Sequence, residues 1–422
     1  MYNLKYLKKI IIINLTVCSI IPFLIWGPFF PDLIISFSAL FFLYYIIKNK
    51  NYIFFKKAPI LIFFIFWIFT IISSLLADDI LLSLKSSFFY FRIGVFACLI
   101  WYLIDKNKNF VNYFYYTLII CFSILVIDGY FQYFNGQNLF GIKIDSSLRV
   151  SSFFNDDLIL GSYLSRLFPL LFSLFLIKQK QKFEKYLIGL LFIFVDVLIF
   201  LSGERTAFFF LNLSTIFIII LIKEYQKFRL ITFIIGMVLI FIMSLNSSTL
   251  TNRMFKEPAK NMGIIKSAQK SVIFTPEHDS HIRTAYNMFK DRPVLGHGPK
   301  MFRVKCKDDK YRVGISPCST HPHNFYVQLL AETGIVGFLF LFISFIYVIY
   351  ASLKQFKCII LNEKRFLSDY QVCLLAGILI TVWPFTPNGN FFNNWLMIVY
   401  SLPVGFYLQS IYSKKIIEKN SN

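Results

Sequence analysis

The chain has 422 residues, of which 57% are hydrophobic and only 15% are charged. Soluble globular domains are about half apolar and about a quarter charged, so this composition excludes a soluble globular protein. The formal net charge of +21 does not indicate nucleic-acid binding, because the basic residues stand in short clusters between apolar runs. The composition therefore predicts a polytopic membrane protein with membrane lipids, and no nucleic acid, as partners.

Long apolar runs follow one another along the chain. The first is preceded by Lys5, Lys8 and Lys9, is too long for the core of a signal peptide and has no small-residue cleavage site after it, so a retained span is predicted. A helix of about 17 to 22 apolar residues crosses a bilayer. About twelve such spans are predicted by this length, at residues 10–29, 31–47, 59–76, 88–104, 111–131, 158–177, 186–201, 207–222, 230–245, 335–350, 367–384 and 394–411.

The connections between these spans alternate in charge. Basic connections are the N-terminus, residues 48–57, 106–108, 178–185, 223–229 and 354–365, and the tail with Lys414 and Lys415. Because cytoplasmic connections are rich in Lys and Arg, both termini are predicted to be cytoplasmic. The opposite, periplasmic side then receives residues 27–30, 77–87, 135–157, 202–205, 246–322 and 386–393.

The connection at residues 246–322 is too long for a simple loop, since it has about 77 residues and loops beyond about a dozen carry function or structure of their own. The fold class is therefore predicted as an all-α integral membrane protein with a large, partly helical periplasmic loop between helices 9 and 10. This divides the chain into membrane helices 1–9 (residues 1–245), a loop domain (246–322), and a re-entry helix with helices 10–12 (323–422).

One helix is predicted inside the long loop. It begins after Thr275, which is followed by a proline, and ends before Pro293. Ile282, Tyr286 and Phe289 have the i, i+4, i+7 spacing of a buried stripe on this helix.

The long loop also contains two of the seven cysteines, Cys306 and Cys318. In an oxidising periplasm they can form a disulfide, which stabilises a chain by about 3 kcal/mol in the chain-entropy model. Two free thiols are the alternative, and the sequence does not decide between the disulfide and the free thiols.

All five histidines occur between residues 278 and 323. His278 and His281 have helical i, i+3 spacing, and His321 and His323 flank a proline, which is a pattern compatible with a metal site. Zinc sites usually add a third ligand at a recognisable spacing. Near these histidines only scattered acidic residues could supply one, so no metal site is predicted.

The stretch from His321 onward, HPHNFYVQLLAETGIVGFLF, leads from polar chain into an apolar run. Thr320 or His321 is predicted to cap a helix, with Pro322 at its first position and Gly334 just past its end. His323 would then lie in the first turn, where the helix end favours a neutral imidazole and attracts an anion such as phosphate. An ordinary capped helix that leads into a membrane span is the alternative.

Three arginines on the periplasmic side are candidate anion ligands. Arg205 lies in LSGERTAFF, a turn between two apolar helices, where a charge usually faces a cavity or a partner. The alternative for Arg205 is an arginine at the membrane surface paired with Glu204. Arg283 and Arg149 are further candidates, and for both the alternative is an exposed, solvated position.

Arg92, Arg166 and Asp196 are charged residues within predicted spans. A charge that faces lipid costs a few kcal/mol, so we expect these side chains to face the helix bundle, where ion pairing is their expected role. The sequence does not identify the partners.

Three motifs resemble one family. SGERTAFF, MFKDRPVLGHGPKMF and HNFYVQLLAETGIVGFLFL are similar to segments of the O-antigen ligase and polymerase superfamily, which are bacterial inner-membrane glycosyltransferases. The stretches DGYFQYFNGQNLFG and RVSSFFND, and the long loop after nine spans, also resemble the family. Two positions depart from it, namely Glu204 in the arginine turn and His297, where the family more often has a small apolar residue.

The resemblance implies an activity and roles for several residues. It implies transfer of a glycan from an undecaprenyl diphosphate carrier to an acceptor sugar, the lipid A core for a ligase, without a metal ion or other cofactor. Arg205 and Arg283 match the arginines that engage the diphosphate, and His323 matches the essential histidine. Direct displacement by the acceptor hydroxyl would invert the configuration of the anomeric carbon. Arg149 and His321 are secondary candidates.

Three other functions compete with the ligase. A polymerase uses the same donor but a lipid-linked glycan as acceptor, and a protein O-oligosaccharyltransferase glycosylates a protein. A transporter or flippase also has about twelve helices, but transporters bind substrate near the midplane between structural repeats. No internal repeat is evident here, and the candidate residues gather at the periplasmic side, which favours the enzyme.

Overall fold

The computed structural model describes residues 4–178, 181–261 and 275–413, and all regular elements in these ranges are helical. The elements before the long loop are α1 (Leu4–Cys18), α2 (Ile20–Phe23), α3 (Phe29–Lys48), α4 (Ala58–Leu75), α5 (Ile80–Ser87), η1 (Phe88–Tyr90), α6 (Phe91–Lys106), α7 (Lys108–Asn135), η2 (Ser152–Phe154), α8 (Leu160–Ile177), α9 (Lys182–Leu201), α10 (Arg205–Leu221) and α11 (Gln226–Asn246). The long loop contains α12 (Ser248–Thr251), the π-helix η3 (Asn252–Lys256), α13 (Glu257–Asn261), α14 (Pro276–Asp291) and α15 (Phe302–Lys305), and α16 (Phe325–Ile360), α17 (Asp369–Thr381) and α18 (Asn394–Tyr412) follow it.

The predicted spans fall on helices, except that the first, residues 10–29, is divided between α1 and α2, and the all-α membrane fold class is confirmed. Within the described residues, eight helical stretches are long and apolar enough to cross a membrane. Several boundaries were wrong: α16 continues to Ile360, into the connection predicted at residues 354–365, and the segment predicted as a connection at residues 77–87 is largely helical. Asp79 caps α5 there by accepting a hydrogen bond from the Leu82 N–H at 2.9 Å, and the helix continues into α6.

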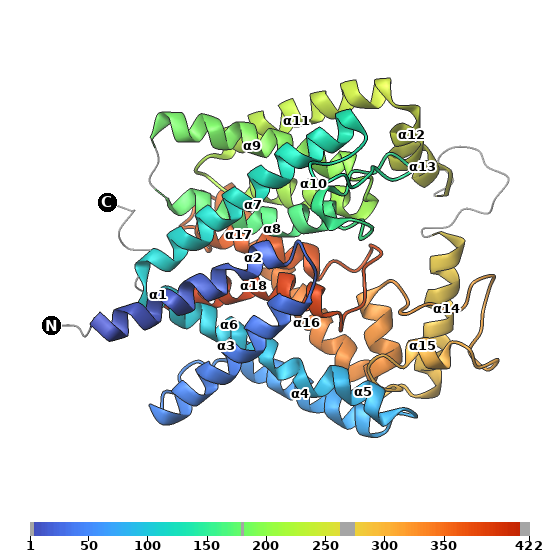
Figure 1. The fold of residues 1–422 in the computed structure, drawn as a ribbon. Coiled ribbons are helices and arrows are strands. Elements are labelled where there is room, and N and C mark those ends of the chain that lie inside the picture. Colours follow the sequence, from blue (N-terminus) through green and yellow to red (C-terminus); the bar gives the residue numbers. More distant parts are fainter. Residues whose placement is uncertain (1–3, 179–180, 262–274, 414–422) are drawn as a thin grey trace.

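The two ends of the bundle differ (Figure 1). The beginning of α1 and the ends of α6 and α18 lie together, and Ser413 beyond α18 donates a hydrogen bond to Asp105 near the end of α6 at 2.7 Å. Helices α12 to α15 lie at the opposite end, which we call the loop end. The basic tail with Lys414 and Lys415 lies outside the described residues. The described ends of the chain therefore share one side of the bundle.

The centre of the bundle is formed by α8, which packs against α10 and α17, while α6 packs against α18. Nearly every side chain of α8 is buried, whereas α3, α4 and α11 expose most of their apolar side chains, as helices that face lipid do. Helix α8 is therefore the most deeply buried of the candidate membrane spans in the described residues.

Two of the three span charges singled out from the sequence form ion pairs. Arg92 pairs with Asp32, and Asp196 accepts two hydrogen bonds from Arg229 at 2.8 and 3.0 Å. The expectation of pairing is confirmed for Arg92 and Asp196. Arg166 has no carboxylate partner among the described residues and instead donates to the side-chain oxygen of Asn388 at 3.2 Å.

The helix predicted in the long loop is α14. Thr275 caps it by accepting a hydrogen bond from the His278 N–H, and the helix ends at Asp291, two residues before Pro293. The predicted buried stripe was wrong, because Tyr286 is 52% exposed. The buried face consists of Ser280, His281, Thr284, Ala285 and Met288, which pack on α15 and α16, so the position of those neighbours determines which side is covered.

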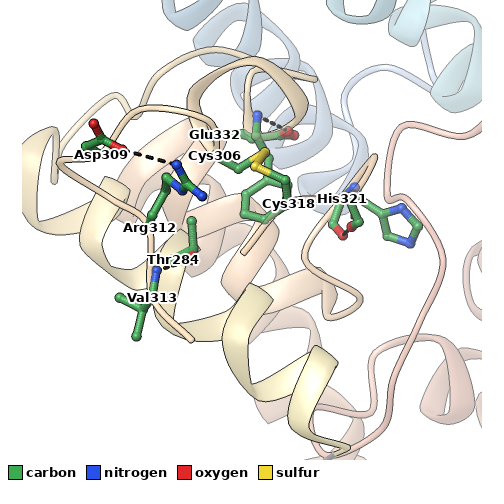
Figure 2. Close-up of a disulfide and its surroundings, with 10 residues drawn as sticks. Thr284, Cys306, Asp309, Arg312, Val313, Cys318, His321 and Glu332 are labelled. Atoms are coloured by element: carbon green, nitrogen blue, oxygen red, sulfur yellow. Dashed lines mark hydrogen bonds and ion pairs between the residues drawn. A yellow bond between two sulfur atoms is a disulfide. The ribbon is translucent and has the colours of Figure 1, made fainter. Parts of the chain in front are cut away.

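Cys306 and Cys318 form a disulfide, which decides between the two alternatives that the sequence left open. Figure 2 shows that it joins the end of α15 to the segment that leads to His321. Cys306 belongs to a small hydrophobic cluster with Met288 and Phe302. The bond therefore anchors the segment before His321 to a packed core.

The long helix α16 bends at Gly334. Its backbone there is left-handed, with φ 65° and ψ −161°, so the first helical piece ends at this glycine as predicted. A Cβ atom at this position would lie 2.2 Å from the carbonyl oxygen of Val294. The segment after α14 crosses at this bend, and the His297 N–H bonds the Ala331 carbonyl at 3.0 Å. The crossing fixes the loop domain against α16.

Candidate active site

A cavity of about 1160 Å³ opens at the loop end. Its walls come from the segment before α8, the turn between α9 and α10, η3, the residues before α15, residues 320–323 and the loop between α17 and α18. The charged side chains that line it within the described residues are predominantly basic: Arg149, Arg166, Arg205, Arg253, Lys300 and Arg303, against Asp157 and Glu204. The cavity is therefore suited to an anion.

The turn between α9 and α10 holds three of these arginines together. Its carbonyl groups accept hydrogen bonds from Arg149 Nε, at 3.1 Å to Ser202, and from Arg253 Nε, at 2.9 Å to Gly203. Arg205 Nε in turn donates to the Arg253 carbonyl at 2.8 Å. Gly203 has φ +66°, and a Cβ there would lie 2.8 Å from Arg149 Cγ, so only glycine fits. We call Arg149, Arg205 and Arg253 the arginine cluster.

The arginine cluster concentrates positive charge. Burial lowers the pKa of Arg149 and of Arg253, and repulsion from neighbouring guanidinium groups lowers both further. Arg205 forms an ion pair with Glu257 of α13, a partly exposed contact with about a third of the arginine side chain accessible. An anion bound between these guanidinium groups would relieve their mutual repulsion.

Glu204 does not pair with Arg205, which was the alternative considered for that arginine. Its carboxylate accepts hydrogen bonds from the Gly161 N–H at 2.6 Å and from the Ser162 N–H and hydroxyl at 3.1 and 2.6 Å. Burial raises the pKa of Glu204 to about 7. Its position fixes the beginning of α8 against the arginine turn.

The start of the helix after Pro322 was predicted wrongly. Helix α16 begins at Phe325, and Asn324 is its cap, accepting hydrogen bonds from the N–H groups of Tyr326 at 3.0 Å and Val327 at 3.1 Å. His323 lies before the helix with a left-handed backbone, φ 57°. The asparagine side chain satisfies two free N–H groups at once, which outweighs the preference of proline for the first turn. His323 nevertheless lines the cavity.

His323 stands in a group of four imidazoles. Its ring centroid lies 4.1 Å from that of His321, 4.7 Å from that of His278 and 5.3 Å from that of His281. In the part of the chain that the structure describes, no three His, Cys, Asp or Glu side chains are arranged to hold a metal ion. Burial, followed by repulsion from the neighbouring histidines, lowers the pKa of His323 to about 3. The imidazole is therefore neutral near pH 7, through burial rather than through a helix end.

The loop between α17 and α18 completes the wall beside His323. The Asn388 N–H donates to the His323 carbonyl at 2.8 Å, and its side-chain oxygen accepts from Arg166. Asn324 donates to the Pro384 carbonyl at 2.8 Å. Residues 386–393 were predicted as a periplasmic connection, but neither this loop nor Arg253, in η3, was predicted to belong to the site. The run PNGNFFNN, polar and turn-forming between two apolar spans, is the signal that indicates such a loop.

The structure brings four of the five sequence-predicted site residues together. Arg205, Arg149, His321 and His323 line the cavity. Arg283 does not, since its guanidinium bonds Asp279 on the same helix at 2.8 Å and the side chain is 63% exposed. A contact between Arg283 and a diphosphate stays a prediction.

One comparison with known proteins bears on this arrangement. Residues 187–342 match the family model described as O-antigen ligase, a range that runs from α9 into α16 and includes Arg205, Arg253 and His323. The match confirms the resemblance stated from the sequence motifs. A comparison with curated proteins finds no match.

Proposed function

On the premise that residues 187–342 belong to the O-antigen ligase superfamily, we propose that the chain is an inner-membrane glycosyltransferase of the ligase type. It transfers a glycan from undecaprenyl diphosphate to a hydroxyl group of an acceptor sugar, the lipid A core, at the periplasmic face. The observation that carries the proposal is one cavity that contains both the arginine cluster and His323.

The arginine cluster is suited to the donor diphosphate. Guanidinium groups remain charged and donate two parallel hydrogen bonds to phosphate oxygens. Because Arg149 and Arg253 are already fixed by the carbonyl groups of the turn, these two neutralise the charge that develops on the departing diphosphate without having to reorganise. Arg205 would exchange its contact with Glu257 for the phosphate.

His323 is the proposed general base, and because burial lowers its pKa to about 3, an anionic substrate bound beside it must raise that pKa for efficient proton transfer. The neutral imidazole accepts the proton of the acceptor hydroxyl while the hydroxyl oxygen forms a bond to the anomeric carbon. The bond from that carbon to the diphosphate oxygen breaks, and both electrons leave with the diphosphate. This direct displacement inverts the anomeric centre, and general-base catalysis typically contributes about 10²- to 10⁴-fold to the rate.

The test is a transfer reaction with the purified, detergent-solubilised protein, a radiolabelled undecaprenyl diphosphate-linked glycan and lipid A core. We expect labelled lipopolysaccharide and free undecaprenyl diphosphate in equal amounts. Transfer to a second donor molecule instead would identify a polymerase, and transfer to a protein would identify an oligosaccharyltransferase. Movement of intact donor across proteoliposomes without release of undecaprenyl diphosphate would refute the enzyme and identify a flippase.

The same distinction can be made in cells that lack the protein. Accumulated lipid-linked polymer beside bare lipid A core would support the ligase. A glycan ladder reduced to single repeats would identify the polymerase.

A further inference from the structure

The cavity has a second basic group, Lys300 and Arg303, separate from the arginine cluster. Neither side chain has a carboxylate or hydrogen-bond partner among the described residues, and the Nε atom of Arg303 is buried without one. The neighbouring Lys305 differs, because it bonds both Asp78 and Asp308. The charges of Lys300 and Arg303 interact with the buried Glu332, but neither cation forms an ion pair with a described carboxylate.

The segment that carries Lys300 and Arg303 is held in place by buried polar groups. Glu332 of α16 is fully buried and accepts hydrogen bonds from the Phe302 N–H at 3.1 Å and from Gln328 at 2.9 Å. Lys300 has a left-handed backbone, φ 64°, which a residue other than glycine adopts at a cost of about 1 kcal/mol. The disulfide at Cys306 anchors the other end of α15. The two cations are thus presented by a fixed segment rather than by a free surface loop.

Lys300 and Arg303 stand on the histidine side of the cavity. The charge of Arg303 is close enough to His321 to lower its pKa, after the larger effect of burial. In Figure 1, α15 and α14 lie on one side of the loop end, while α12 and α13, which flank the arginine in η3, lie on the other. The two basic groups therefore belong to different walls.

Direct displacement at an anomeric carbon requires the attacking hydroxyl and the leaving group to lie on opposite sides of that carbon. If the arginine cluster holds the diphosphate, then the side with His323 receives the acceptor. Cations on that side are poorly placed for the leaving group but well placed for a second anion.

We infer that Lys300 and Arg303 bind an anionic group, a phosphate or a carboxylate, of the acceptor next to the hydroxyl group that His323 deprotonates. The acceptor is accordingly an acidic glycan. This inference rests on the proposed function and adds the chemical class of the acceptor to it.

The experiment compares acceptors with and without their charges. Purified protein receives a fixed donor and three acceptors: intact lipid A core, the same material dephosphorylated with hydrofluoric acid, and the same material with its carboxyl groups reduced. The variants are Lys300→Met, Arg303→Met and, as a matched control, Lys307→Met, an exposed lysine on the same segment that does not line the cavity.

We expect Lys300→Met and Arg303→Met to raise the acceptor KM about 10- to 100-fold, the effect of losing a charged hydrogen bond, with the donor KM unchanged. Lys307→Met should match the unmodified protein. Removing the recognised charge from the acceptor should raise its KM equally and abolish the difference between variants.

Three results would overturn the inference. Equal KM values for all three acceptors would mean that charge is not recognised, and an increase confined to the donor KM would assign the two cations to the diphosphate. In both of these the transfer reaction persists, so the proposed function survives. No transfer by the unmodified protein to any acceptor would remove the proposed function and the inference together.

Discussion

The arginine turn can be tested by the substitution Gly203→Ala. Gly203 has φ +66°, where a residue with a side chain is strained by about 1–2 kcal/mol. The new Cβ atom would also lie 2.8 Å from Arg149 Cγ and 3.2 Å from Arg253 Nε. Both arginines would have to move away from the carbonyl groups that orient them. Loss of one charge-assisted bond to the diphosphate corresponds to about 1.5–3 kcal/mol, or roughly 10- to 150-fold in donor affinity.

Gly136→Ala provides a matched control. Gly136 has φ +75°, so alanine there suffers the same backbone strain, but no atom lies within 4 Å of the added Cβ. Gly136→Ala therefore reports the effect of backbone strain alone, and Gly203→Ala should lower the thermal unfolding midpoint of the purified protein at least as much. Only Gly203→Ala should weaken the binding of undecaprenyl diphosphate, measured by isothermal titration in detergent. Equal donor affinities for the two variants would refute the role assigned to the turn.

Three further predictions follow from the site. Glu257→Gln should raise donor affinity up to about fivefold, because it removes an exposed ion-pair partner worth about 0–1 kcal/mol from the arginine that binds phosphate; weaker donor binding would contradict this. Replacing Cys306 and Cys318 with serine should reduce the free energy of unfolding by about 3 kcal/mol. If the unmodified protein had the same unfolding temperature with and without reductant, the disulfide would not stabilise the fold as proposed. Because burial lowers the pKa of His323 to about 3, its imidazole should stay unprotonated between about pH 8 and pH 5, measured by NMR of isotope-labelled histidine with His323→Ala used to assign the signal; protonation centred near the ordinary histidine pKa of about 6.5 would contradict the neutral base.

The membrane helices were predictable because the length of an apolar run is a local property of the sequence. The turn that carries Arg205 was predictable for the same reason, since a charged residue between two apolar runs stands out. The cap at Thr275 and the bend at Gly334 also depend on local chemistry, and the structure places both as expected.

The remaining features depend on contacts between distant segments. Arg253 joins the site only because a turn 50 residues earlier accepts its hydrogen bond, and Asn388 only because its loop crosses His323. Tyr286 was expected to be buried, but the buried face of α14 is determined by α15 and α16, which no periodicity within α14 reveals. The start of α16 was missed because two capping rules competed within three residues, and Asn324 prevailed through two hydrogen bonds.

The central claim is that His323 deprotonates the acceptor hydroxyl that attacks a donor held by the arginine cluster in the same cavity. The most direct measurement compares donor binding and glycan transfer in His323→Ala and in the unmodified protein, under the same conditions. The account predicts that the variant binds undecaprenyl diphosphate-linked glycan with unchanged affinity but transfers it about 10²- to 10⁴-fold more slowly. Transfer at the unmodified rate by His323→Ala would contradict the account.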